Sequence, residues 1–505
     1  MTESGETEDL RASRGLSRLM DLPWYPVLFA AAWVLNLWVE TGVSVLAMTR
    51  SLAFVVVGVA SILVIATLVS RRPLVAGVIT ITGFGLLVSR NALHAVAVVL
   101  LTVTIPLAVW YWARISHRPF SLQRLTRALN VFCALILALV IIGGIGPGTL
   151  AAVPMDLAQG GPAGTGLDLP ASSSDGKLDI VVLLLDGYPR ADWYARHFGG
   201  DNSGFLEELE ARGFSVAHES TSNYMFTQLT LASMFHMRPV PEIPELEPVF
   251  DGSMHGHPRL RNTINDNPVF DFLRDRGYRI VSFGPGYEHV ALRQADVYLD
   301  DGLLNDFEYE LLRSTAVESL LLRLDPGFHA EQKRQRVRDG FDAFTAVATD
   351  DGGGPTFAFI HLPAPHLPVV FAADGSAAPL PPSGNIHGRE DEDQLPSEAY
   401  VAQLEYLNGR VLDAIDTVLA PDRAAREPIL IVMSDHGAER RPQVFESDGT
   451  PAHYANLFAA RTPGATDVFP ENHSPINTFP RLFNAYFGTD IEEWPDSRYP
   501  WIASP

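Results

Sequence analysis

The sequence predicts an α/β fold with a central, mainly parallel sheet, preceded by an N-terminal module of about five transmembrane helices. Continuous apolar runs such as 178–185 and 429–433 are typical of strands buried inside a parallel sheet. Strand-like and helix-like segments alternate after residue 178, which favours an open sheet covered by helices on both faces. Long apolar stretches recur before residue 150, and they predict the membrane module.

Charge is divided unevenly along the 505 residues. Residues 1–150 carry eleven Arg and six acidic residues, a net charge of +5. Because the whole chain carries −22, the remainder carries −27. This division indicates two environments and argues against nucleic acid as a partner of the acidic part. The single cysteine, Cys133, lies in an apolar run, which excludes a disulfide within the chain and a four-cysteine metal site.

The membrane module begins after a polar tail, residues 1–21. Five apolar stretches follow, at 22–39, 51–70, 73–89, 92–113 and 128–150. Residues 51–150 contain no Asp or Glu. About 20 apolar residues cross a bilayer, so the first and third stretches are near the lower limit and five is the expected number. Because the stretches recur, a cleaved signal peptide does not account for them.

The arginines of this module predict its orientation. With the N-terminus in the cytoplasm, nine of them fall in inner segments, whereas only Arg50 and Arg90 fall outside. This distribution satisfies the positive-inside rule and places everything after residue 150 outside the cytoplasm. Residues 151–177 are rich in Gly, Pro, Ser and Ala and predict a flexible linker. We therefore expect a multi-pass cell-membrane protein whose domain 178–505 is extracytoplasmic.

The elements of that domain are predicted from apolar runs, amphipathic periodicity and turn residues. The expected strands are 178–185, 279–283, 355–361 and 429–433, and the expected helices are 204–212, 268–276 and 397–419.

Two of the predicted strands end in an acidic residue beside a glycine. These are Asp186-Gly187 and Asp435-His436-Gly437. One such aspartate is routine as a turn former or helix cap. Two of them, one with a histidine attached, predict ligands of a single cation, because ligands bind beyond the carboxyl ends of parallel strands.

Thr227 lies where the segment SNYMF turns into an apolar helix. Its hydroxyl can cap that helix and do nothing more. It can also be a nucleophile, since a helix N-terminus receives phosphate and a metal ion lowers the pKa of a hydroxyl. His361 and His366, in HLPAPH, are expected in a loop at the same edge, although loop histidines are often merely solvated. His453 is a weaker candidate for this cluster.

Five segments carry a family resemblance in the family's order. They are DIVVLLLDGYPR, SNYMFTQLTLASMF, FAFIHLPAPHLP, IVMSDHGAE and SPINTFPRLFNAYFG. Residues 178–490 thereby resemble the sulfatase-like branch of the alkaline-phosphatase superfamily. The layout, with membrane spans before this domain, is similar to lipoteichoic acid synthases and lipid A phosphoethanolamine transferases.

The resemblance implies a divalent cation held by Asp186, Thr227, Asp435 and His436. It implies that His361 and His366 bind a substrate oxyanion or a second metal. Zinc, manganese and calcium all occur in the family, and imidazole favours zinc or manganese over calcium. True sulfatases carry a Cys/Ser-x-Pro-x-Arg motif that is absent around Thr227, which argues against sulfate-ester cleavage by that route.

Three hypotheses follow. The first is a membrane-anchored, metal-dependent phosphotransferase or phosphodiesterase that acts on envelope phospholipid or glycopolymer. In it Thr227 attacks phosphorus, while His361 and His366 hold phosphate oxygens or protonate the leaving group. The second is a hydrolase of small phosphate or sulfate esters. The third is a catalytically inactive binding module of the envelope.

Overall fold

The computed structural model describes residues 21–41, 45–89, 111, 114, 121–144, 178–246, 258–299, 304–350, 354–379, 397–420, 427–438 and 452–499. The chain divides into two compact units. Unit 1 is Met1–Leu157 together with Asn305–Asp325, and unit 2 is Ala158–Leu304 together with Pro326–Pro505. The tail 1–20, nearly all of the fourth apolar stretch, and the linker lie outside the described residues.

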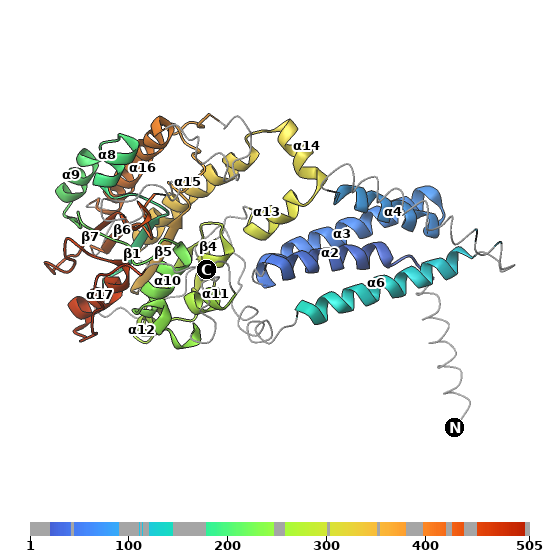
Figure 1. Cartoon of the computed structure of the whole chain (residues 1–505), viewed down its shortest axis with the longest axis horizontal. Helices are drawn as coiled ribbons and strands as arrows, with labels where there is room; N and C mark the ends of the chain where they lie inside the picture. The colour runs from blue at the N-terminus through green and yellow to red at the C-terminus, as the bar shows by residue number, and fades with distance from the viewer. Residues whose placement is uncertain are drawn as a thin grey trace, which may run out of the picture. The chain divides into compact units, whose positions relative to one another are not determined.

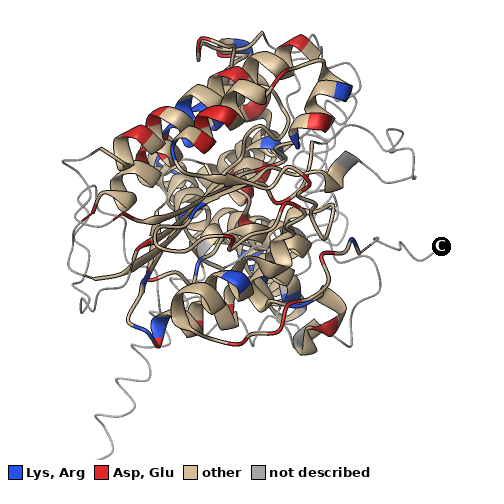
Figure 2. Ribbon diagram, turned by 90° about the vertical axis from the view of Figure 1, so that its left-hand side faces the viewer, with Lys and Arg blue, Asp and Glu red and all other residues tan. Residues whose placement is uncertain are grey.

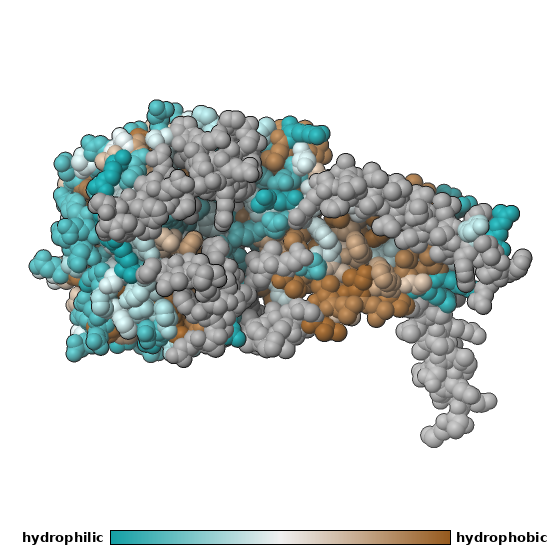
Figure 3. Space-filling view, in the orientation of Figure 1, coloured by the Kyte–Doolittle hydropathy of each residue, from teal (hydrophilic) through white to brown (hydrophobic). Residues whose placement is uncertain are grey.

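Unit 1 contains four apolar helices among its described N-terminal residues: α2 Tyr25–Thr41, α3 Val45–Ser70, α4 Pro73–Leu87 and α6 Leu122–Gly144 (Figure 1). Two segments, Ala47–Ser70 and Leu122–Ile142, are long and apolar enough to cross a membrane, whereas α2 and α4 are shorter. The prediction of five spans is therefore not confirmed. The surface of these helices is largely hydrophobic (Figure 3).

Unit 1 also contains α13 Asp306–Arg313 and α14 Ala316–Leu324. Both fall inside the range 178–505 that the sequence analysis assigned to one domain. The chain thus enters unit 1 a second time, between β4 and α15 of unit 2.

Unit 2 is built on a sheet whose described strands follow the order β2-β7-β6-β1-β5-β3-β4. Their bounds are β1 Ile180–Leu185, β2 Ser215–Val216, β3 Arg279–Phe283, β4 Val297–Leu299, β5 Thr356–Leu362, β6 Ile429–Met433 and β7 Phe458–Arg461. β1 pairs in parallel with β5 and β6, and β3 pairs in parallel with β4 and β5. Only the pairings of β7 with β2 and β6 are antiparallel, so the predicted mainly parallel sheet is confirmed.

Helices cover both faces of this sheet (Figure 1). One face carries α8 Ala191–Phe198, α9 Ser203–Ala211, α15 Phe328–Ala348 and α16 Ser397–Val418. The other carries α10 Thr227–His236, α11 Pro258–Asn265, α12 Pro268–Arg274 and α17 Thr478–Phe487. Short 3₁₀ turns are η1 Val240–Glu242, η2 Pro244–Leu246, η3 Glu288–Val290, η5 Ala452–Tyr454 and η6 Pro475–Asn477.

The uninterrupted apolar sequence of β1 follows from this layering. Val181, Leu183 and Leu185 pack into the core of the first face, whereas alternate residues of the strand pack into the core of the second. A strand buried on both faces has no polar side. Acidic side chains instead lie on the helices around the sheet, in keeping with the net charge of the sequence after residue 150 (Figure 2).

Candidate metal centre and nucleophile

The carboxylates of Asp186 and Asp435 lie at one edge of the sheet because their strands are parallel neighbours. Leu184 of β1 pairs with Met433 of β6, and the polar residues follow directly after these strands. The Asp186 N–H donates to the Leu362 carbonyl at 3.1 Å, which continues the β1–β5 ladder past the end of β1. The backbone thus fixes where both side chains emerge.

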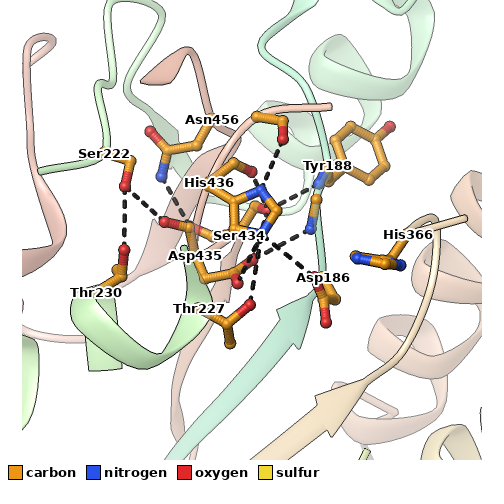
Figure 4. A network of polar contacts seen from close by, with 12 residues as sticks. Asp186, Tyr188, Ser222, Thr227, Thr230, His366, Ser434, Asp435, His436 and Asn456 are labelled. Atoms are coloured by element: carbon orange, nitrogen blue, oxygen red, sulfur yellow. Dashed lines mark hydrogen bonds and ion pairs between the residues drawn. The ribbon is translucent and has the colours of Figure 1, made fainter. Parts of the chain in front are cut away.

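Asp186, Asp435 and His436 bring potential ligand atoms within 4.8 Å of one another (Figure 4). His436 Nε2 lies 3.6 Å from Asp186 Oδ1 and 3.3 Å from Asp435 Oδ2. All three residues are at most 1% exposed. Asp186 Oδ1 and Asp435 Oδ2 have no hydrogen-bond partner in the part of the chain that the structure describes. Buried carboxylate oxygens without donors are costly unless a cation compensates them, so the residues fit a metal ion.

The orientation of the His436 ring supports the same conclusion. Its Nδ1 lies 2.8 Å from the carbonyl oxygen of Gly437, so a proton on Nδ1 donates there. With its proton on Nδ1, the ring points Nε2 toward the two carboxylates, as a metal ligand requires. One nitrogen and carboxylate oxygens are a donor set that suits zinc or manganese.

Thr227 is the first residue of α10 and does not cap that helix. The N-cap is Phe226, and no side chain caps the helix there. The Thr227 hydroxyl instead lies 3.4 Å from His436 Nε2, turned toward the carboxylates (Figure 4). Of the two interpretations left open by the sequence, the structure thus excludes the N-cap, and the hydroxyl lies beside the candidate metal ligands.

His361 is located differently from the prediction. It lies inside β5 rather than in the loop, because β5 continues to Leu362. Its Nε2 is 3.3 Å from Asp186 Oδ2 and the residue is 1% exposed. His361 therefore lies behind Asp186 and orients that carboxylate.

His366 occupies the loop position, and its ring faces that of His436 with 6.5 Å between centroids. It is partly exposed, and its Nδ1 lies 2.7 Å from the Leu367 carbonyl. His453 lies in η5, where its carbonyl accepts from the Gly437 N–H at 2.6 Å. It is not among the described residues whose ligand atoms cluster within 4.8 Å.

Burial and the surrounding imidazoles act in opposite directions on Asp186. Burial raises the pKa of its carboxyl group, but the nearby rings of His366, His361 and His436 outweigh burial and hold the pKa below its ordinary value. The carboxylate is therefore charged at neutral pH.

Sequence reasoning missed a set of polar side chains that hold the Asp435-His436 turn. Ser434 Oγ accepts from the Tyr188 N–H at 2.8 Å and donates to the His436 carbonyl at 2.7 Å. Asn456 Nδ2 donates to the Ser434 carbonyl at 2.7 Å. The available signal was a serine directly after an apolar strand, a position where a hydroxyl usually satisfies backbone groups.

Asp435 is fixed from two further sides. Its Oδ1 accepts from the Gly187 N–H at 3.1 Å, and its carbonyl accepts from Ser222 Oγ at 2.6 Å. Ser222 begins the segment that leads to Thr227, so this bond joins the segment of the candidate nucleophile to the turn of the candidate metal ligands (Figure 4).

The loop that carries His366 is held by one side chain from α15 and one from α16. Lys333 Nζ donates to the carbonyls of His366 and Pro368, at 2.5 and 3.1 Å. The buried Gln403 donates to the Pro365 carbonyl at 3.2 Å and accepts from the Val370 N–H at 2.8 Å. These partners come from α15 and α16, which are distant from the motif in sequence.

Comparison with known proteins gives one family. The family model described as Sulfatase matches residues 179–483. No curated protein matches the sequence.

Solved structures to which this chain is similar include the following three. The soluble domain of lipooligosaccharide phosphoethanolamine transferase A from Neisseria meningitidis is 12% identical over 62% of this chain and 89% of that chain, with a TM-score of 0.39. The C-terminal periplasmic domain of EcEptC from Escherichia coli is 14% identical over 64% and 88%, with a TM-score of 0.40. The integral membrane EptA from Neisseria meningitidis is 12% identical over 92% and 94%, with a TM-score of 0.35. No conclusion about substrate follows from similarity at this level.

Proposed function

Because the chain belongs to the sulfatase family, within the alkaline-phosphatase superfamily, we propose that it is a membrane-anchored, metal-dependent phosphotransferase or phosphodiesterase. Its substrate is a phospholipid or glycopolymer of the cell envelope, and Thr227 is its nucleophile. One observation carries the proposal: the Thr227 hydroxyl lies 3.4 Å from His436 Nε2, beside two buried carboxylates with unpartnered oxygens. A cation bound by these carboxylates would be close enough to this hydroxyl to activate it as a nucleophile.

Asp186, Asp435, His436 and Thr227 would hold the cation, with zinc or manganese favoured and calcium also accommodated. A divalent cation bound there supplies positive charge, which lowers the pKa of a coordinated hydroxyl and neutralises charge in the transition state. The chain's own contribution is rigidity, because the ligands extend from two paired strands and a turn held by Ser434 and Ser222.

In the first step, the Thr227 oxygen attacks phosphorus, forming an O–P bond while the bond to the leaving alcohol breaks. The threonine proton passes to water, and His366 at the partly exposed side protonates the leaving oxygen. In the second step, an acceptor hydroxyl attacks phosphorus of the covalent Thr227 phosphodiester and gives its proton to His366, while the bond to the Thr227 oxygen breaks and that oxygen takes a proton from water. His361 keeps the Asp186 carboxylate oriented throughout.

A phosphate rather than a sulfate ester is the better substrate for these residues. The chain has threonine at the nucleophile position, and the Cys/Ser-x-Pro-x-Arg motif of true sulfatases is absent. Threonine transfers a phosphoryl-type group directly as a covalent ester.

The membrane anchoring is supported by the two long apolar helices within 47–70 and 122–142. The arginine distribution supports an extracytoplasmic location for the domain 178–505, joined to the membrane module 22–150 by the linker 151–177. We propose that the lipid bilayer therefore brings this site close to lipid-linked substrates.

The test is turnover of a chromogenic phosphodiester, bis(p-nitrophenyl) phosphate, by the full chain with zinc or manganese. Thr227→Ala is expected to lose about 10³-fold or more in kcat, since the covalent step is removed. Thr227→Ser, which keeps the hydroxyl, should retain measurable turnover and yield, by mass spectrometry, a serine peptide that carries a p-nitrophenyl phosphate group. Wild-type turnover by Thr227→Ala would remove this residue from the mechanism.

Transfer and hydrolysis are separated by their products. Vesicles that contain a phospholipid donor and a hydroxyl acceptor are expected to yield a modified acceptor together with diacylglycerol. Release of free phosphate ester alone would favour the hydrolase hypothesis, and a protein that retains no metal in zinc-replete buffer would favour the inactive binding module.

A further inference from the structure

Exposed large hydrophobic side chains are confined to two places in the part of the chain that the structure describes. One is the set of N-terminal helices, and the other is α14. On α14, the exposed residues are Val317, Leu320 and Leu324, which are 36%, 58% and 79% exposed. None of the described residues of unit 2 belongs to this class. A group of exposed apolar side chains outside the N-terminal helices indicates an interaction site on α14.

The three residues form one stripe along the helix. Their spacing of three and four positions places them on the same face. Ser319 and Arg323 are also exposed but lie on a neighbouring strip, whereas Leu321 is half-covered. α14 therefore has an apolar side and a polar side that are both uncovered, and none of its residues is buried.

α14 follows directly after a helix that is anchored among the membrane helices. Phe307 of α13 is fully buried in a cluster with Val34, Leu37, Ala47 and Met48. Arg50 of α3 donates to both carboxylate oxygens of Glu308. The amide of Asn305 donates to the Ala47 carbonyl at 3.2 Å. These contacts fix α13 beside α2 and α3, at the beginning of α3.

α14 contacts one of the N-terminal helices that expose large apolar side chains. α14 lies against α4, whose Ile79 and Leu87 are 54% and 42% exposed (Figure 1). The space-filling view shows hydrophobic surface at α14, beside polar side chains of the same helix (Figure 3). A nine-residue helix is too short to be stable by itself in water, so a surface that receives its apolar side would stabilise it.

We propose that α14 lies in the membrane–water interface, with Val317, Leu320 and Leu324 inserted among lipid chains and Ser319 and Arg323 facing water. The partner is a lipid surface, because α14 belongs to the same unit as the apolar helices and contacts α4, which also exposes large apolar side chains. An interfacial amphipathic helix pairs an apolar face with a polar face in this way. The inference rests on the membrane anchoring proposed above. It gives residues 305–325 the role of a second membrane attachment.

The experiment uses single-cysteine variants of the full chain, since Cys133 is the only cysteine and Cys133→Ala provides the background. An environment-sensitive fluorophore is attached at Leu320→Cys or at Leu324→Cys. The matched control is Ser319→Cys, which is exposed on the polar strip of the same helix. The membrane control is Phe54→Cys on α3, a site that is 79% exposed.

Each labelled protein is reconstituted in phosphatidylethanolamine–phosphatidylglycerol vesicles. Quenching is measured with a nitroxide-labelled lipid and with aqueous iodide. Turnover of the chromogenic phosphodiester verifies that each variant is folded. The inference expects labels at positions 320 and 324 to be quenched several-fold more by the lipid nitroxide than the label at 319, which iodide should quench instead.

Two results overturn the inference while leaving the anchoring intact. If the label at 54 is quenched by lipid but those at 320 and 324 are quenched only by iodide, α14 faces water. If the labels at 320 and 324 are protected from both quenchers, protein covers the stripe, and a second copy of the chain is its occupant. If the label at 54 also escapes the lipid nitroxide, the membrane anchoring itself fails, and this inference fails with it.

Discussion

Replacing Ser434 with alanine removes the side chain that joins the metal-binding turn to β1. Ser434 is fully buried. Its hydroxyl accepts from the Tyr188 N–H at 2.8 Å and donates to the His436 carbonyl at 2.7 Å. Ser434→Ala therefore breaks these two hydrogen bonds and a longer contact of the hydroxyl with Asp435 Oδ1, at 3.3 Å. It changes no candidate ligand of the cation.

The magnitude follows from these two bonds. The Tyr188 N–H keeps a longer hydrogen bond to the Leu185 carbonyl, at 3.3 Å, so the cost is that of the lost bonds, about 0.5–1.5 kcal/mol of folding free energy each. Loss of a group that orients metal ligands typically reduces metal affinity by about 10- to 100-fold. We expect both effects, because the same hydroxyl supports the fold and fixes the carbonyl of His436.

The assay measures zinc affinity of the purified full chain by competition with a chromophoric chelator, together with the thermal midpoint with and without zinc. The matched control is Ser233→Ala. Ser233 on α10 is 1% exposed, and its hydroxyl has no hydrogen-bond partner among the described residues. The same substitution there removes a buried hydroxyl without breaking a hydrogen bond. Equal zinc affinities for the two variants would refute the positioning role of Ser434.

Two further predictions concern pH and unit 1. Burial, and then the neighbouring Arg481, hold the pKa of His473 well below its ordinary value of 6.5. Below pH 6.5 the unfolded chain therefore binds a proton at His473 that the folded chain does not bind. The free energy of unfolding is unaffected by this proton above pH 6.5, and it falls by about 1.4 kcal/mol per pH unit below pH 6.5. His473→Gln should flatten the decline of the thermal midpoint between pH 6.5 and 5, and an unchanged slope would contradict the assignment. In unit 1, Arg50→Glu and Glu308→Arg should each lower the thermal midpoint, because each breaks the ion pair between the two side chains. The double variant restores a pair of opposite charges and should recover part of the loss, with a coupling free energy of about 0.5–3 kcal/mol in a double-mutant cycle. Strictly additive effects of the two substitutions would contradict a direct ion pair.

The central elements were predictable because their sequence signals are local. The predicted bounds of β3, at 279–283, and of β6, at 429–433, agree with the structure. Each is an apolar run that ends at a polar or glycine-containing turn. The meeting of Asp186 with Asp435 and His436 was predictable for a geometric reason, since parallel neighbouring strands end at the same edge.

The ends of the membrane helices were predicted less well, because hydropathy detects only the apolar part of a helix. The fifth stretch was predicted at 128–150, whereas α6 runs from Leu122 to Gly144. Its first turns carry Arg124 and Arg127, which are compatible with a helix but lower the mean hydropathy.

The location of α13 and α14 was not predictable from the sequence. The amphipathic pattern of α13 indicates that one face of the helix is covered, but not by which part of the chain. The covering residues of α13, such as Val34 and Ala47, are more than two hundred positions away. Long-range packing of this kind decides domain membership without leaving a local signal. The same reason explains why Lys333 and Gln403 were missed as supports of the His366 loop.

The candidate metal ligands and the loop of His366 are held in place by different parts of the fold. The candidate metal ligands Asp186, Asp435 and His436 follow strands that are buried on both faces, and their turn is held by backbone and serine hydrogen bonds. Strand ends fixed in this way cannot adapt much to substrate, so they determine metal affinity and the position of the nucleophile. His366, in contrast, lies in a partly exposed loop whose conformation depends on side chains of two helices. Substrate preference can therefore vary through the loop and its supports while the metal centre stays intact, which is how one fold can serve different esters.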